Sequence, residues 1–114
     1  MSQFAKSLFI AGLFSVAGCG SLDAHCDFRA PPKSSARCQE RLGSAGAFAF
    51  KQTCGAAGGT AGDGACPREE IVAGCDIGTQ GDGSHVVDWY YAPKTMQDVM
   101  SACMSDSGTL LPKP

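Results

Sequence analysis

The clearest hydrophobic pattern in the chain lies close to its C-terminal end. Five apolar residues recur there at the i, i+3, i+4, i+7 and i+8 spacing of one helical face: Met96, Val99, Met100, Cys103 and Met104. Thr95 is a good N-cap, Asp98 suits the first turn, and Gly108 follows the pattern as a stop. These signals predict a helix over about 95–106.

The apolar stripe of this helix is expected to pack in the core, methionines included. Methionine has an unbranched, flexible side chain that fills irregular gaps between other core residues. A metal relay or a promiscuous binding groove is the alternative interpretation of three methionines on one face.

Two runs of strand-forming residues precede this helix and predict a β-hairpin. Residues 71–77 and 85–91 flank the turn-prone segment "GTQGDGS". Side chains alternate across a strand, so we expect Trp89 to face inward and Tyr90 and Tyr91 to take opposite sides.

A short repeat indicates two similar units. Cys54 to Thr60 and Cys103 to Thr109 both read Cys-x4-Gly-Thr. The first follows a possible helix over about 45–57, which Gly58 and Gly59 would end. Each unit is therefore expected to hold a helix with a cysteine near its C-terminus, a glycine stop and a strand that begins at the threonine.

The N-terminal apolar run has the layout of a secretory signal peptide. Lys6 precedes about a dozen apolar or small residues, whereas a membrane-spanning helix needs roughly twenty. A basic start, a short apolar middle and a small-residue exit are typical of a signal that is removed. Residues 1–18 are therefore expected to be a signal peptide.

The exit of this run, Val16-Ala17-Gly18-Cys19, resembles the lipobox of bacterial lipoproteins. The resemblance implies cleavage before Cys19 and attachment of lipid to its thiol, which would make Cys19 an anchor to a membrane. Two or three acyl chains hold a protein durably at a bilayer. The residue after the cysteine is Gly20, which by the same resemblance favours the outer membrane of the cell envelope. The alternative is a secreted protein without lipid, with Cys19 in a disulfide.

The remaining cysteines predict a disulfide-stapled scaffold. Setting Cys19 aside from the 7 cysteines of the chain leaves an even set: Cys26, Cys38, Cys54, Cys66, Cys75 and Cys103. Such density in a short exported chain indicates an oxidising compartment. The sequence does not separate the possible pairings; a pairing of successive cysteines, 26 with 38, 54 with 66 and 75 with 103, serves as the working hypothesis.

Residues 19–37 lack apolar periodicity and include Pro31-Pro32 and Ser34-Ser35, so they are expected to form a lipidated N-terminus and flexible tether. The folded domain would then span 38–114. Its expected fold class is small, disulfide-rich α+β, with a short antiparallel sheet formed by the hairpin 71–77/85–91 and two short helices, about 45–57 and 95–106.

Segments of this domain resemble a family of small cysteine-rich lipoproteins of myxobacterial type. The resemblance rests on "CGAAGGT", "GACP", "VAGCDI", "VVDWYYAP" and "SACMSDSGTLLP" and covers about residues 38–112. Ser107 and Leu110 depart from the family's usual glycine and aromatic residue. The resemblance implies the fold and the location, and it implies no activity.

Charge and motif spacing exclude several function classes. The net charge is -2, and the basic residues are scattered, unlike the clustered patch of a nucleic-acid binder. The cysteines lack the short paired spacings of a zinc site. Neither His25 nor His85 is placed to activate a reduced thiol. No cofactor, metal or catalytic residue is therefore expected.

One further segment echoes a calcium loop through a set of polar residues: Asp76, Gln80, Asp82 and Ser84, with Gly81 at the turn. Gly78 stands at a ligand position, and Val87 stands where a bidentate glutamate belongs. A solvated hairpin turn explains the same residues.

These observations predict a membrane-anchored envelope lipoprotein that acts as a non-catalytic binding or structural module. The expected partners are the membrane, through lipid on Cys19, and an envelope protein or polysaccharide. An inhibitor or protective protein against an exported enzyme is the alternative, and a small hydrolase is the third hypothesis.

Overall fold

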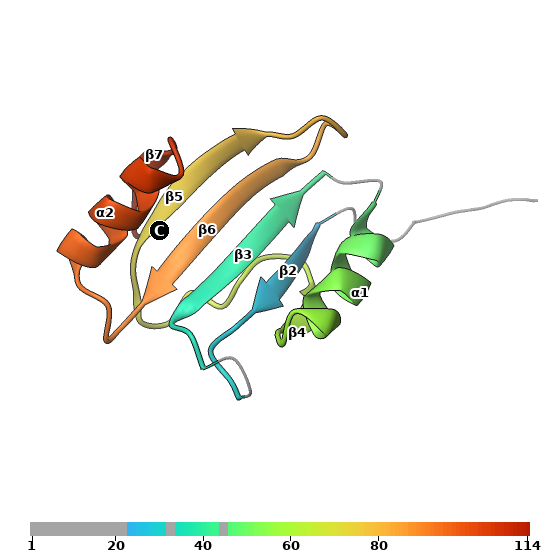
Figure 1. The fold of residues 1–114 in the computed structure, drawn as a ribbon, viewed down its shortest axis with the longest axis horizontal. Helices are drawn as coiled ribbons and strands as arrows, with labels where there is room; N and C mark the ends of the chain where they lie inside the picture. The colour runs from blue at the N-terminus through green and yellow to red at the C-terminus, as the bar shows by residue number, and fades with distance from the viewer. Residues whose placement is uncertain (1–22, 32–33, 44–45) are drawn as a thin grey trace, which may run out of the picture.

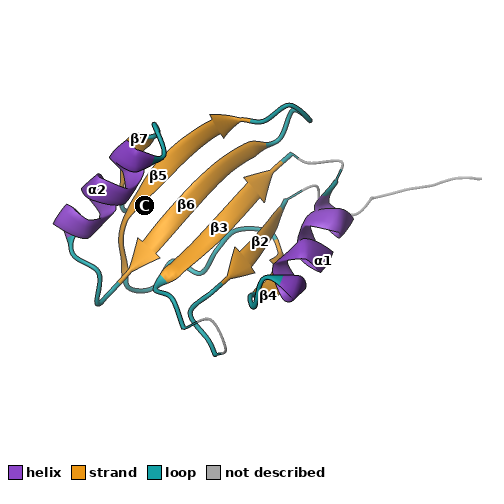
Figure 2. Cartoon of the chain, viewed as in Figure 1, coloured by secondary structure: helices purple, strands orange, loops and turns teal. Residues whose placement is uncertain are grey.

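The computed structural model describes residues 23–31, 34–43 and 46–114. They form a small α+β fold with a 6-stranded antiparallel sheet and two helices (Figures 1 and 2). The strands are β2 (Ala24–Asp27), β3 (Arg37–Leu42), β4 (Thr60–Asp63), β5 (Ile71–Thr79), β6 (His85–Tyr91) and β7 (Thr109–Pro112). The helices are α1 (Ala47–Ala56) and α2 (Met96–Ser105). The α+β class is confirmed, and so are both helices and the hairpin β5–β6.

The sheet is larger than the predicted hairpin, and it includes part of the predicted tether. Its strand order is β4-β2-β3-β6-β5-β7. Strands β2 and β3 both begin within residues 19–37, and β2 pairs with β3 on one side and β4 on the other. Residues 24–27 and Arg37, which were expected in the tether, therefore belong to the sheet. Residues 1–22, including the predicted signal peptide and Cys19, lie outside the described residues.

The two halves of the domain repeat the same strand–strand–helix–strand order. The first half is β2, β3, α1 and β4, and the second is β5, β6, α2 and β7. Equivalent residues stand 49 positions apart, as Cys75 does from Cys26 and Cys103 from Cys54. The Cys-x4-Gly-Thr repeat is the part of this larger duplication that runs from the end of each helix to the start of the next strand. Both predicted strands, β4 at Thr60 and β7 at Thr109, are present.

The strand registers show that the duplication is a pseudo-twofold arrangement. Cys26 lies opposite Gln39 and Ala61, and the equivalent Cys75 lies opposite Asp88 and Leu110. Strands β3 and β6 meet at the centre, where Gln39 lies opposite its own equivalent, Asp88. A pseudo-twofold axis therefore passes through the Gln39–Asp88 pair, perpendicular to the sheet.

Both helices cover the same face of the sheet, one over each end (Figure 1). Directly opposed residues share a face, so Cys26, Gln39, Asp88 and Cys75 form one row on that side. The ends of this row are tied to the helices by the disulfides Cys26–Cys54 and Cys75–Cys103.

Each helix–strand turn needs a glycine beside its disulfide. A Cβ at Gly59 would lie 2.9 Å from Cys54 Sγ, and one at Gly108 would meet Cys75 Sγ and lie 2.8 Å from the Asp76 carbonyl oxygen. Real Cβ atoms essentially never approach so closely. The glycine of the repeated Cys-x4-Gly-Thr is thus required by packing as well as by the turn.

The other face of the sheet is covered by the connection between β4 and β5. The third disulfide, Cys38–Cys66, fastens this connection to β3. Arg68 Nη1 lies 3.0 Å from Glu40 Oε1, and its guanidinium stacks over the Trp89 ring at 5.1 Å. The Tyr91 hydroxyl donates to the Pro67 carbonyl oxygen at 2.6 Å. Burial raises the pKa of Tyr91 to about 12, so this donor keeps its proton.

The core clusters follow the two faces. Trp89 and Tyr91 lie in the cluster with Cys38 and Cys66, whereas Tyr90 packs with Cys75 and Cys103 under α2. Trp89 is buried, and Tyr90 and Tyr91 point to opposite faces, which confirms both expectations for β6.

All 6 described cysteines are in disulfides, which indicates an oxidising, extracytoplasmic compartment. The working pairing was right for Cys75–Cys103 and wrong for the other two bridges, which join Cys26 to Cys54 and Cys38 to Cys66. Successive cysteines were a poor guide because β2 contacts α1 and β4, while β3 contacts the segment after β4.

Helix α2 begins as its sequence predicts. The Thr95 side chain accepts a hydrogen bond from the Asp98 N–H, and the Asp98 carboxylate accepts one from the Thr95 N–H. This capping box satisfies two N–H groups that would otherwise lack partners. Of the described helices, neither has the length and apolar character to cross a membrane.

Candidate docking surface between α2 and β7

The second half of the domain exposes a row of methionine side chains. Met96, Met100 and Met104 are 45%, 46% and 78% exposed, whereas Val99 and Cys103 of the same helix are buried. We call the three methionines the methionine ridge. The prediction that the whole apolar stripe packs in the core is therefore wrong for these residues.

Helix geometry explains why the stripe divides in this way. Successive residues turn by about 100° around an α-helix, so Val99 and Cys103 share one direction, toward the sheet. Met96, Met100 and Met104 follow one another by about 40° around the helix axis, so they turn step by step away from the sheet on one flank of α2. Met96 lines a cleft together with Pro112 of β7, so this flank is the one that faces the β7 edge of the sheet.

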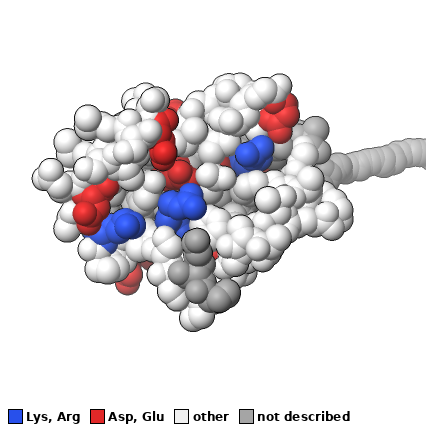
Figure 3. Space-filling view, viewed as in Figure 1, with Lys and Arg blue, Asp and Glu red and all other residues white. Residues whose placement is uncertain are grey.

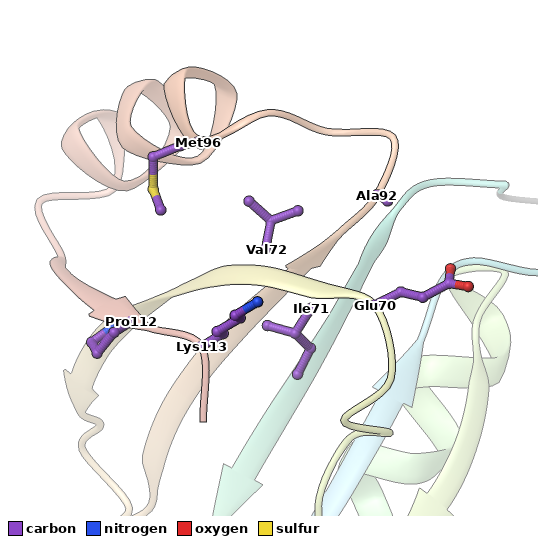
Figure 4. Close-up of a pocket in the computed structure, with 7 residues that line it drawn as sticks. All are labelled: Glu70, Ile71, Val72, Ala92, Met96, Pro112 and Lys113. Carbon is purple, nitrogen blue, oxygen red and sulfur yellow. The ribbon is translucent and has the colours of Figure 1, made fainter.

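The cleft lies below the start of α2 and has a volume of about 600 Å³ (Figure 4). Its apolar lining comes from Ile71, Val72, Ala92, Met96 and Pro112. Two charged residues, Glu70 and Lys113, also line it. The Lys113 side chain lies beside the apolar residues, while the Glu70 carboxylate points away from them (Figure 4). Within the described part of the chain, no carboxylate pairs with the Lys113 ammonium.

Among the described strands, β7 lies at the edge of the sheet, and no described strand pairs with its outer side. It pairs with β5, with Ala73 opposite Pro112 and Cys75 opposite Leu110. Proline has no N–H, so the Ala73–Pro112 pair is a non-hydrogen-bonded pair, and so is the pair two residues away at Leu110. The Leu110 N–H and C=O therefore point outward, and the Leu110 side chain is 42% exposed beside α2.

The equivalent surface in the first half is built differently. Lys51 occupies the position of Met100, and Asp63 occupies that of Pro112. These two residues form an ion pair that links α1 to β4. The remaining methionines correspond to Ala47 and Gly55. The fold is thus compatible with small or charged residues at every one of these positions, so the methionines and Pro112 are not required by the architecture.

A space-filling view of the helix face shows where charged side chains are exposed (Figure 3). Charged groups lie over the middle of the face, above β3 and β6, and also on the side that α2 covers, while the surface over α1 is mostly uncharged. Charge on this face therefore does not distinguish the two halves, and the difference between them lies in the residues at the helix–edge surface.

Hydrogen bonds to the buried carboxylate of Asp88 link the two halves of the domain at the pseudo-twofold axis. Asp88 is buried, and its Oδ1 accepts from Gln39 Nε2 at 2.9 Å and from Arg37 Nη1 at 3.1 Å. Burial raises the pKa of Asp88, and the hydrogen bond from Gln39 and the positive charge of Arg37 oppose that rise. The Arg37 guanidinium also stacks over the Phe28 ring at 4.6 Å. These contacts give Asp88 a structural role between the two halves.

The residues that resemble a calcium-binding loop make hydrogen bonds and an ion pair with one another and with His85. Asp76 Oδ1 accepts from the Gly78 N–H at 2.9 Å and lies 2.7 Å from His85 Nε2. Asp82 accepts from the Ser84 N–H and hydroxyl, which lowers the pKa of Asp82. These contacts make a closed hairpin turn. Among the described residues, no group of three or more His, Cys, Asp or Glu side chains is arranged to hold a metal ion.

A smaller cleft of about 280 Å³ lies beside α1. Its polar lining comes from Arg41, Thr53 and Asp82. The Arg41 guanidinium stacks over the Phe50 ring at 5.0 Å, and its Nη1 lies 3.5 Å from Asp82 Oδ2. Because the Asp82 carboxylate lies near Arg41, the positive charge that Arg41 brings to this cleft is partly neutralised.

The sequence singled out Cys19 and the other 6 cysteines as its site residues. Cys19 lies outside the described residues, and the rest are structural disulfides. The docking surface was missed, although the 49-residue repeat of Ala-x-Cys-Asp at Ala24 and Ala73 could have aligned the two halves and shown Met100 against Lys51. Comparison of the chain with protein-family models, with curated proteins and with solved structures found no match.

Proposed function

We propose that this protein is a lipid-anchored, non-catalytic binding module of the cell envelope, and that its α2–β7 surface holds an extended apolar segment of a partner protein. The observation that carries the proposal is the asymmetry of the duplicated halves. One half closes its helix–edge surface with the Lys51–Asp63 ion pair, and the other leaves it apolar and open.

The edge strands favour an extended partner. Charged side chains on an edge strand oppose pairing with another chain, and Asp63 places such a charge on β4. Strand β7 carries Thr109-Leu110-Leu111-Pro112, without a charge. A partner strand beside it would bond the outward N–H and C=O of Leu110 and would place alternate side chains against the methionine ridge. Pro112 confines this pairing to a short stretch.

The charges around the cleft specify the partner further. The Lys113 ammonium lies at the apolar lining with no carboxylate partner among the described residues. A carboxylate on the bound segment would therefore complement it. A largely aliphatic lining offers few hydrogen-bonding groups to a sugar, which is the reason to prefer a protein over a polysaccharide.

An unbiased peptide-library selection against the disulfide-bonded mature chain tests the proposal. The expected peptides alternate apolar residues and include an acidic one. A variant that copies the first half, Met96→Ala with Met100→Lys and Pro112→Asp, should stay folded and bind them at least tenfold more weakly. Phe48→Ser, which removes a side chain that is 72% exposed on α1, is the control and should bind normally. Equal binding by the copied variant would refute the proposal.

Membrane attachment is tested separately in cells. Cys19→Ala is expected to leave an unprocessed precursor that is released from the membrane fraction. Normal processing and attachment of that variant would show that the lipobox resemblance misleads, without any consequence for the docking surface.

A second function, inhibition of an exported enzyme, is favoured by the hairpin tip of β5 and β6. The Gln80 N–H donates to the Ser84 carbonyl at 2.7 Å, and Asp82 lies 3.5 Å from Arg41 Nη1. A tip held in this way suits insertion into an enzyme cleft. Inhibition of a secreted protease or glycosidase that is lost with Asp82→Ala and retained by the copied variant would favour this function.

A further inference from the structure

We propose that the methionine ridge binds a soft monovalent metal ion of the copper(I) or silver(I) class. The inference concerns the sulfur atoms of the ridge and does not depend on the docking of a partner protein.

The chemistry of the available donors selects this class of ion. Thioether sulfur is a soft ligand that suits copper(I), whereas carboxylate groups suit hard cations such as magnesium and calcium. The cysteines of the described residues are all oxidised to disulfides, so their thiolates do not compete. The three thioethers of Met96, Met100 and Met104 are the uncommitted sulfur donors of the described domain, and one helix carries all of them.

The spacing allows two sulfurs to share one ion. Residues four apart on a helix have Cβ atoms about 5–6 Å apart. The zinc–thiolate bond, about 2.3 Å long, sets the scale of a metal–sulfur bond, so two sulfurs on opposite sides of one ion are separated by roughly 5 Å. Flexible methionine side chains close this small difference without moving the helix.

Met100 has a special position within the ridge. Met96 and Met104 are eight residues apart, which is about 12 Å along the helix, so they do not share an ion. Met100 lies one turn from each and is common to both possible sulfur pairs. The ridge therefore binds one ion at a time through Met100 and one neighbour.

The ridge is accessible and is not needed for the fold. Its side chains are 45–78% exposed, and the side chain of Met96 extends from α2 toward the cleft (Figure 4). The equivalent helix α1 carries Ala47, Lys51 and Gly55 at the same positions, with no sulfur. Three thioethers in one accessible row thus distinguish α2 from its structural copy.

Titration calorimetry with silver nitrate in chloride-free buffer tests the proposal on the disulfide-bonded mature chain. We expect one ion per chain. Met100→Leu should weaken binding at least tenfold, Met96→Leu and Met104→Leu should each weaken it a few-fold, and the double variant Met96→Leu/Met104→Leu should match Met100→Leu. The methionine methyl resonances should shift with the same ion and stay unchanged with zinc.

The leucine variants keep the volume and the apolar surface, so they should fold normally. Pro112→Asp keeps all three methionines, so it should bind silver as the native chain does even where it no longer binds the selected peptides. Failure of metal binding is thereby distinguished from failure of the docking proposal. Undiminished silver binding by the triple leucine variant would overturn the inference. Equal, independent losses at the three positions would overturn it as well, because they would mean isolated thioethers without a shared ion.

Discussion

The duplicated fold predicts that its two equivalent disulfides contribute equally to stability. The bridges Cys26–Cys54 and Cys75–Cys103 have the same sequence separation, 28 residues, and all four cysteines are at most 3% exposed. In the chain-entropy model, a bridge that closes a loop of this length stabilises the folded state by about 3.6 kcal/mol at 25 °C. We therefore expect about this loss when either bridge is replaced by a pair of alanines.

The free energy lost with each bridge predicts what happens when both disulfides are removed together. A domain of this size is expected to have a total unfolding free energy of about 5–14 kcal/mol. Removal of one bridge should leave a folded, weakened domain, and removal of both, at a cost of about 7 kcal/mol, should bring it close to or past the point of unfolding.

Urea denaturation followed by circular dichroism measures both single-bridge variants. The two free energies of unfolding should agree to within about 1 kcal/mol, and non-reducing peptide mapping should show that the untouched bridges persist. A loss below about 1 kcal/mol for one bridge, with the full loss for the other, would refute the energetic equivalence of the halves.

Three further predictions concern single residues. Gly108→Ala should destabilise the domain by about 1–3 kcal/mol in urea denaturation because its Cβ would meet the sulfur of Cys75; Gly55→Ala, in a helix with open space around it, should instead be neutral or stabilising. Thr95→Ala should cost about 1 kcal/mol by removing the capping box of α2, and full stability without the hydroxyl would contradict the cap. Burial raises the pKa of Asp88 in the folded state, so the stability that its protonated form contributes is complete below its ordinary pKa of 3.8 and is lost as the pH rises through the raised value. An asparagine at this position would not titrate, so the unfolding free energy of Asp88→Asn minus that of the native chain should increase with pH between these two pKa values. A difference that stays constant with pH would contradict the raised pKa.

The sequence by itself determined the elements whose signals are local. The capping residues Thr95 and Asp98 are three positions apart, and the two runs of the hairpin are joined by a short turn, so helix α2 and strands β5 and β6 could be predicted from neighbours in the chain. The glycine stops of both helices were read in the same way.

Strands β2 and β3 escaped prediction because their stability is not local. Strand β2 alternates apolar and polar residues, but it has only four residues, too few for a clear strand signal, and it is held by pairing with β3 and with the distant β4. The disulfide pairing was hidden for the same reason, since Cys26 and Cys54 meet only after α1 has packed on the sheet.

The candidate site was decided by tertiary structure alone. Helical periodicity groups Met96, Met100 and Met104 with Val99 and Cys103, but it does not show how wide a part of the helix the sheet covers. Among the described strands, β7 is the last on this side, next to β5, which carries Cys75. Helix α2 therefore buries Val99 and Cys103 against the sheet and leaves the methionine ridge exposed. The periodicity of the sequence predicted that this helix has an apolar face, and the position of the sheet edge determined that part of this face is exposed to solvent.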